Sequence, residues 1–416
     1  MYITVRDRPG ADQLRSGPRA RVASTVVLLG VVSMLTDVSS EMVNAVLPIY
    51  LTAHVGISLL GYGIIDGLYQ GVSSLVRVAG GYAADRGRRP KWVAVIGYGL
   101  SALSRIALLP AQTMGAITSV VIADRLGKGL RTAPRDALIA DAADPAALGR
   151  SFGVHRMLDT IGAALGPIAA FALLLLLPDG YDAVFVVSFA VALVGLAVLV
   201  LFVPNRRLGR APSAQKPSRR DILRVLTTPA LRRPLLAAAL LGLLTVGDGF
   251  LYLTLQQRDD LAAQYFPLLA VGTNVAYLAL AVPLGRLADR VGRGRVFLGG
   301  HLALLGAYLA AGSLTGGWTA TIVALVFFGA YYAATDGVLP ALVSRLVPDN
   351  GRATGIAAAQ TVVVVARFAS SLGFGALALN LGTASALLAV VPALAVALPV
   401  AAWLMRPRPD VRAEAT

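Results

Sequence analysis

The chain has 416 residues, of which 56% are hydrophobic and 14% are charged, and its mean hydropathy is +0.71. This balance excludes a single soluble globule with a polar surface, so most of the chain is expected to lie in lipid. The net charge of +15 would also suit a nucleic-acid-binding protein, but the basic residues are spread over many short loops without interleaved aromatic residues, which argues against that class. The absence of cysteine excludes disulfides and thiolate metal sites.

Apolar runs of about 20 residues recur along the chain, and this is the length that a helix needs to cross roughly 30 Å of hydrocarbon. Because backbone groups in lipid must be satisfied internally, these runs are predicted to be helices. Dividing the chain at charge clusters and at turns rich in Gly, Pro and Asn predicts twelve spans, at residues 22–51, 58–84, 91–111, 114–143, 150–177, 182–204, 234–256, 262–289, 294–314, 318–346, 352–379 and 382–405. Residues 1–21 lack an apolar core that leads to a cleavage site, so they are expected to be a tail rather than a signal peptide.

Arginine and lysine concentrate in the loops on one side of these spans. They precede span 1, lie between spans 2 and 3, 6 and 7, and 8 and 9, and follow span 12, whereas the loops of the other side contain only Arg258. The positive-inside rule therefore places both termini and the central linker in the cytoplasm of a multi-pass protein of the cytoplasmic membrane.

A repeated segment indicates that the chain is a duplication. Gly81-Tyr-Ala-Ala-Asp85-Arg86 ends span 2, and Gly285-Arg-Leu-Ala-Asp289-Arg290 ends span 8, about half a chain later. We therefore predict an all-α integral membrane protein of two pseudo-symmetric six-helix bundles, with a tail at 1–21, bundles at 22–204 and 234–405, a cytoplasmic linker at 205–233 and a second tail at 406–416.

With these features the chain resembles the major facilitator superfamily over nearly its whole length, and in particular the bacterial drug/proton antiporters. The two repeated segments resemble motif A of that family, although the first lacks the residue usually found between Arg86 and Gly87. Span 4 carries Arg125-Leu-Gly-Lys-Gly129, which is similar to motif B, and span 5 carries a segment similar to motif C, which in this family accompanies export by antiport. The resemblance implies gating by Gly81, Asp85, Arg86, Gly285, Asp289, Arg290, Gly292 and Arg293, and close helix packing at Gly162, Gly166 and Pro167.

Ionisable residues inside the spans are the main functional signal, because each is costly in hydrocarbon unless it faces water or a partner. At about 1.5 Å per residue, Asp37, Arg125, Asp248 and Arg367 lie near the membrane midplane. The candidate residues for proton coupling are Asp37, Glu41, Asp66, Asp124, Arg125, Asp159 and Asp248. The candidate residues for the substrate cavity are Gln70, Arg105, Lys128, Asn274, Tyr277, Asp336 and Arg367.

Two transport hypotheses follow from these charges. The first is a proton-coupled exporter of drugs or metabolites, in which Asp37 or Glu41 titrates opposite Arg125 as the cavity opens to either side. The second is a transporter or exchanger of organic anions or phosphorylated metabolites, because inward-pointing cations can hold a carboxylate or a phosphate. The structural alternative is a buried ion pair, such as Asp124 with Lys128 or Asp37 with Arg125.

A membrane sensor without transport is a third class. The sequence does not predict an enzyme, since it has no phosphate-binding loop, no HExxH and no credible pair of nucleophile and base. We expect a gradient as the energy source, a small solute, protons and membrane lipids as partners, no cofactor or metal, and a monomeric protein.

Overall fold

The computed structural model describes residues 22–87, 89–144, 147–205, 229–313, 316–336 and 352–406, with the backbone alone at 73–75, 77–87, 229–230 and 352–358. The residues within these ranges form helices and connecting loops, with no strand among them. Nine described segments are long and apolar enough to cross a membrane. The predicted all-α membrane architecture is therefore confirmed.

The first half contains six long helices. They are α1 (Ser24–Ile49), which continues into one π-helical turn (Tyr50–His54), α2 (Leu59–Gly87), α3 (Pro90–Ala107), α4 (Met114–Ala142), α5 (Leu148–Leu176) and α6 (Tyr181–Phe202). Three of them, α2, α3 and α4, are absent from the nine apolar segments. Among their described residues, α3 and α4 contribute most of the charged side chains discussed below.

The second half repeats this arrangement with one interruption. It contains α8 (Pro229–Leu243), α9 (Asp248–Arg258), a 3-10 turn η3 (Ala263–Tyr265), α10 (Phe266–Val291), α11 (Arg293–Gly312), α12 (Trp318–Thr335), α14 (Arg352–Leu381) and α15 (Thr383–Leu404). Gly292, from the motif A segment, has φ of +104° at the turn between α10 and α11, which explains why glycine stands there.

The predicted span at 234–256 lies within one apolar segment, Leu231–Arg258, but its helix is interrupted, because residues 244–247 separate α8 from α9. Side chains of neighbouring helices replace the lost helical hydrogen bonds. The Tyr308 hydroxyl accepts from Val246 N–H at 2.7 Å and donates to the Leu244 carbonyl at 3.3 Å, and Ser370 donates to the Thr245 carbonyl at 2.9 Å. A break at membrane depth is tolerated where protein supplies such partners.

The helix contacts show that the two halves share one architecture. In the first half α1 packs on α5 and α6, α2 on α4, and α3 on α4 and α6; in the second half α8 packs on α14 and α15, α10 on α12, and α11 on α12 and α15. The pairs α2·α14 and α5·α10 join the halves, and they are equivalent positions of the repeat.

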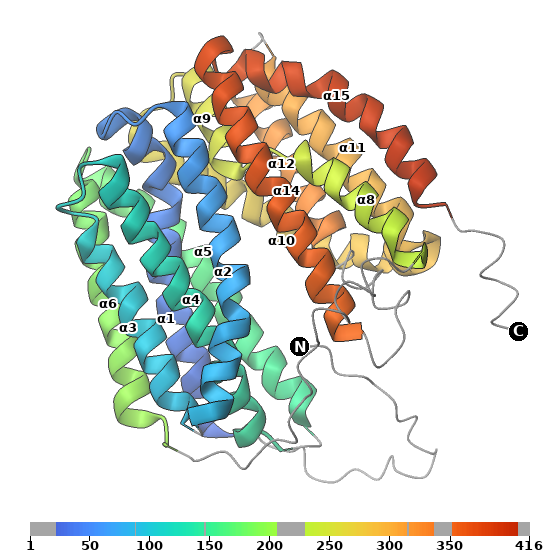
Figure 1. Cartoon of the computed structure of the whole chain (residues 1–416). Coiled ribbons are helices and arrows are strands. Elements are labelled where there is room, and N and C mark those ends of the chain that lie inside the picture. The colour runs from blue at the N-terminus through green and yellow to red at the C-terminus, as the bar shows by residue number, and fades with distance from the viewer. Residues whose placement is uncertain are drawn as a thin grey trace, which may run out of the picture.

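The two bundles meet near one end and separate towards the other (Figure 1). At the closed end, a Cβ on Gly375 of α14 would lie 2.7 Å from the Leu59 carbonyl oxygen of α2, and the rings of Phe171 and Tyr265 lie 6.1 Å apart. At the other end, a Cβ on Gly153 of α5 or on Gly285 of α10 would have nothing within 4 Å. The closed end is the one that the charge distribution predicts to face away from the cytoplasm.

Candidate functional site

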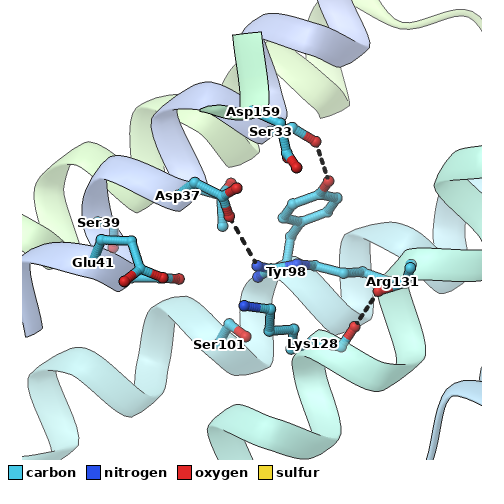
Figure 2. A network of polar contacts seen from close by, with 12 residues as sticks. Ser33, Asp37, Ser39, Glu41, Tyr98, Ser101, Lys128, Arg131 and Asp159 are labelled. Carbon is cyan, nitrogen blue, oxygen red and sulfur yellow. Dashed lines mark hydrogen bonds and ion pairs between the residues drawn. The ribbon is translucent and has the colours of Figure 1, made fainter. Parts of the chain in front are cut away.

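Charged side chains from α1, α4 and α5 meet inside the first bundle. Figure 2 shows Asp37 and Glu41, one turn apart on α1, facing Lys128 and Arg131, one turn apart on α4. The described ion pair between these helices joins Arg131 Nη2 to Asp37 Oδ1 at 4.0 Å. This distance is too long for a hydrogen bond, so the pair is loose.

Asp37 also contacts a second carboxyl group, that of Asp159 on α5, within hydrogen-bonding range. Two carboxyl groups can form a hydrogen bond with each other only when one of them holds a proton. Asp159 has two cationic partners, with Arg135 Nη1 at 3.8 Å and Arg156 Nη1 at 3.6 Å, and these stabilise its carboxylate form. Asp37, whose cationic partner is 4.0 Å away, is therefore the carboxyl group of the two that is freer to take up a proton.

Arg131 and Lys128 have incomplete sets of partners. The Arg131 side chain is 4% exposed, and its guanidinium carbon lies 4.7 Å from the centre of the Tyr98 ring. Its Nη1 has no hydrogen-bond partner among the described residues. Lys128 is partly buried, and its ammonium group forms no ion pair or hydrogen bond with any residue in the described part of the chain. Two cations therefore share one loosely bound aspartate.

A second cluster in the same bundle has shorter ion-pair distances than the first. Arg105 Nη1 donates to Asp124 Oδ1 at 2.6 Å, and Arg125 Nε donates to Asp124 Oδ2 at 2.8 Å. Arg105 also donates to Ser40 Oγ at 2.9 Å, and Arg125 stacks on the Tyr69 ring at 3.6 Å. This cluster is a buried structural network.

The second cluster corrects three sequence-based expectations. Arg125 pairs with Asp124 and not with Asp37, whose cation is Arg131 instead. Asp124 pairs with two arginines and not with Lys128. Arg105, expected to line the substrate cavity, does line a pocket together with Tyr69 and Asp124, but it is 4% exposed and already holds two partners.

A third cluster lies where α2 of the first bundle meets α9 and α14 of the second. Asp66 of α2 accepts a hydrogen bond from the Ser371 hydroxyl and a further one from Gln70. A Cβ on Gly247, the residue before α9, would lie 2.5 Å from Asp66 Oδ2, so the broken helix approaches this carboxyl group closely. Asp66 and Gln70 therefore belong to the contact between the bundles.

Beside this contact, aromatic hydroxyls hold the charges of the second bundle. Asp248 at the start of α9 accepts from the Tyr332 hydroxyl, and Arg367 donates to the Tyr331 hydroxyl at 2.7 Å. Arg367 Nε has no partner among the described residues. The structure thus brings Asp66, Asp248 and Arg367 into one region, where Ser371 is the partner of Asp66 on the second bundle and tyrosines are the partners of Asp248 and Arg367.

The remaining predicted cavity residues lie on α10 and α12. Asn274 and Tyr277 are partly buried on α10, and Asp336 is exposed directly after α12. Tyr277 lies close enough to Asp336 for an electrostatic interaction. Tyr277 also lies within electrostatic reach of Arg156 on α5, which pairs with Asp159.

The glycines and charges of the family motifs fall into two groups. The side chains of Asp85 and Arg86 and the surroundings of Gly81 lie outside the described residues. In the second copy Asp289 is 66% exposed and pairs with Arg293 of α11 at 3.3 Å, while Arg290 is exposed.

The segment similar to motif C packs α5 against α1. A Cβ on Gly162 would collide with the Met34 carbonyl, and one on Gly166 would lie 2.8 Å from the Val38 carbonyl. Pro167 lies inside α5 without interrupting it. The small residues therefore allow the close helix contact that keeps Asp37 beside Asp159.

Sequence reasoning missed the tyrosines and Ser371 as partners, and it counted Arg131 among the inward-pointing cations without pairing it with Asp37. Arg131 lies three residues after Lys128, a spacing that shares a helix face, and this was the available signal. The tyrosines gave no such signal, because an aromatic residue in an apolar span is more often a packing residue than a hydrogen-bond partner of a charged group.

Comparison with known proteins gives consistent matches over most of the chain. The family model described as Major Facilitator Superfamily matches residues 29–273 and 259–416. An uncharacterized MFS-type transporter of Methanocaldococcus jannaschii is 31% identical over 365 residues, which cover 84% of this chain and 87% of the relative. An uncharacterized protein of Mycobacterium bovis is 28% identical over 364 residues and 85% of both chains.

Solved structures with the same fold have low sequence identity. The nucleoside transporter NupG superposes with a TM-score of 0.78 at 13% identity, covering 92% of this chain and 100% of that chain. A POT family transporter in complex with 5-aminolevulinic acid gives 0.76 at 13%, covering 92% and 97%, and an inward-facing bacterial homolog of the human lysosomal transporter Spinster gives 0.71 at 15%, covering 92% and 98%.

Proposed function

Because the chain belongs to the major facilitator superfamily and is a membrane transporter rather than an enzyme, we propose that it couples the movement of a small solute to protons through Asp37. Following the positive-inside rule, we place it in the cytoplasmic membrane with both termini in the cytoplasm. We also expect it to work as a monomer. Transporters of this family work by alternating access, so the coupling group must change its partner between the two states.

The contact between Asp37 and Asp159 is the observation that carries this proposal. It holds one exchangeable proton between α1 and α5, next to Arg131 at 4.0 Å. If Arg131 moves closer, the carboxylate of Asp37 is stabilised and the proton leaves; if it moves away, Asp37 takes up a proton again. A small shift of α4 against α1 can therefore change the protonation state.

Glu41 is the second carboxylate that we assign to this site. It accepts a hydrogen bond from Asn44 at 3.1 Å, and its Cβ lies near Gly166 of α5. Its place one turn from Asp37 puts it on the same face of α1, within electrostatic reach of Lys128 and Arg125. We expect it to act on the site through the charge of Lys128.

Two candidates remain for the solute and its direction. Export in exchange for protons is favoured by the similarity of Gly162–Pro167 to motif C. Transport of an anionic solute is favoured by the incomplete partners of Lys128 and Arg131.

Proteoliposomes that contain a pH-sensitive dye test the coupling directly, because the dye reports proton movement. Addition of a transported solute should change the internal pH with the wild type. Asp37→Asn and Asp159→Asn should abolish this proton movement, while solute counterflow, which needs no gradient, persists. The control Asp182→Asn removes an exposed carboxylate at the start of α6 and should behave as wild type. Full proton movement with Asp37→Asn would refute the proposal.

A further inference from the structure

The loose ion pair between α1 and α4 leaves the positive charges of Lys128 and Arg131 only partly compensated in the described part of the site. Arg131 is 3% exposed, and its Nη1 has no partner, while Asp37 lies 4.0 Å from the other terminal nitrogen. The ammonium group of Lys128, on the same face of α4, has no ion pair or hydrogen bond with the described residues. A buried guanidinium that lacks an anion is costly, so such a site is expected to have a ligand that completes it.

The groups that face Asp37 decide what this ligand is. They are Lys128 and Arg131 from α4, Asp159 from α5, Tyr98 from α3 behind Arg131, and Glu41 on α1 itself. Asp159 is held by its own arginines, and the hydrogen bond with Asp159 requires a neutral Asp37. When Asp37 is protonated, Glu41 is the carboxylate that remains within electrostatic reach of Lys128, and it forms no ion pair with Lys128 or Arg131 among the described residues.

We infer that Lys128 and Arg131 bind an anionic group of the transported solute, a carboxylate or a phosphate, and that they do so when Asp37 is protonated. This inference rests on the proposed function. Arg131 presents the planar donor pair that matches such groups, and Lys128 adds a point charge one turn away. An ionised Asp37 competes for the same guanidinium, so proton binding and anion binding strengthen each other.

This mutual strengthening has a direct consequence for coupling. A proton and an anion that bind together cross the membrane together, so the solute moves in the same direction as the proton. Exchange would require the opposite, namely a solute whose binding expels the proton. The chemistry of Lys128 and Arg131 thus favours symport of an anionic solute over the export by exchange that motif C suggests.

Binding of small anions to the purified full-length protein in lipid nanodiscs tests the inference. The probes are succinate and inorganic phosphate, with tetraphenylphosphonium as the cationic comparison, and calorimetry at pH 5.5 and pH 8 gives the affinities. At least one of the two anions should bind more tightly at pH 5.5, with a change of up to about tenfold per pH unit where Asp37 titrates. The probe that binds with the higher affinity indicates whether the solute carries a carboxylate or a phosphate.

Substitutions then assign the effect to the site. Lys128→Met and Arg131→Gln should each weaken anion binding about tenfold or more, since a hydrogen bond to a charged group is lost. Lys128→Arg and Arg131→Lys keep the charge and should restore part of the affinity, which also controls for folding. Asp37→Asn should lose the tighter binding at pH 5.5 and keep only the pH dependence that comes from the titration of the probe itself. Arg295→Gln removes an exposed charge at the start of α11 and should leave binding unchanged.

The inference is overturned if neither anion binds at either pH, or if Lys128→Met and Arg131→Gln bind the anion as the wild type does. It is also overturned if tetraphenylphosphonium binds in preference to both anions. The dye assay for proton movement separates this failure from that of the proposed function. Proton movement that depends on Asp37 with a cationic solute would leave the proposed function intact and remove only the anion site.

Discussion

Gly375 of α14 offers a direct test of how the two bundles close. Its missing side chain allows α14 to lie against α2, because a Cβ there would be 2.7 Å from the Leu59 carbonyl oxygen and 3.2 Å from the Leu60 Cα. Both neighbours are backbone atoms, so they cannot rotate away. Gly375→Ala therefore requires the two helices to separate by about half an ångström, and overpacking of this kind costs about 1–3 kcal/mol.

This cost falls on the state in which α2 and α14 touch at this end. A penalty of about 1–3 kcal/mol changes the ratio of two states by about 5- to 150-fold. Gly375→Ala should therefore shift the protein towards the state in which this end is open. Gly373 lies on the same helix with nothing within 4 Å of its Cβ position, so Gly373→Ala is the matched control.

Spin labels provide the measurement, because the chain has no cysteine and introduced cysteines are labelled without background. Labels at Gln112 and Asn380, both exposed near the closed end, report the separation of the bundles by pulsed electron resonance. Gly375→Ala should lengthen the dominant distance, and Gly373→Ala should not. The reasoning fails if both variants give the wild-type distribution, or if both lengthen it equally.

Three further predictions concern stability, measured as thermal unfolding in detergent. Asp124→Asn leaves two buried guanidinium groups without a carboxylate, so it should lower stability by about 3–5 kcal/mol, and an unchanged midpoint would contradict the buried network. Gly249→Ala pushes a side chain onto the Tyr62 hydroxyl of the opposite bundle, so Tyr62→Phe should relieve part of the damage, with a coupling of about 0.5–3 kcal/mol in a double-mutant cycle, whereas additive effects would show that the two do not touch. The hydrogen bond from Arg258 lowers the pKa of Asp259 in the loop after α9. The Asp259 carboxylate therefore stabilises the fold fully at any pH above its pKa in the unfolded chain, which is about 4, and this stabilisation is lost only as the pH falls towards the folded-state pKa. Asp259→Asn should therefore lower the midpoint of thermal unfolding equally at pH 7 and pH 5.

The sequence predicted the architecture well, because lipid makes the signal strong. A run of apolar residues in a membrane protein has few alternatives to a spanning helix, and the repeated Gly-x-x-x-Asp-Arg segment marked the duplication. The break between α8 and α9 escaped prediction, since Thr245, Val246 and Gly247 continue an apolar run. Its stability comes from Tyr308 and Ser370, which lie on other helices and far away in the sequence.

The sequence predicted which residue types form the site, but it did not predict which of these residues pair with each other. Spacing placed acids on α1 and cations on α4, but it could not set the rotation of one helix against the other. Arg125 and Arg131 are six residues apart and therefore point to different sides of α4, and only the packing decides which one meets Asp37. The contact of Asp37 with Asp159 depends on the close approach of α1 and α5 at Gly162 and Gly166.

The helices that bridge the two halves have mechanical consequences. The α2 and α5 helices have 29 residues each, so each is a rod of about 44 Å that contacts the opposite half near one tip. A stiff rod with a pivot between its tips cannot spread at one end without converging at the other. The molecule therefore needs no separate device to keep its two entrances from being open at the same time; the lever geometry of two equivalent rods enforces it.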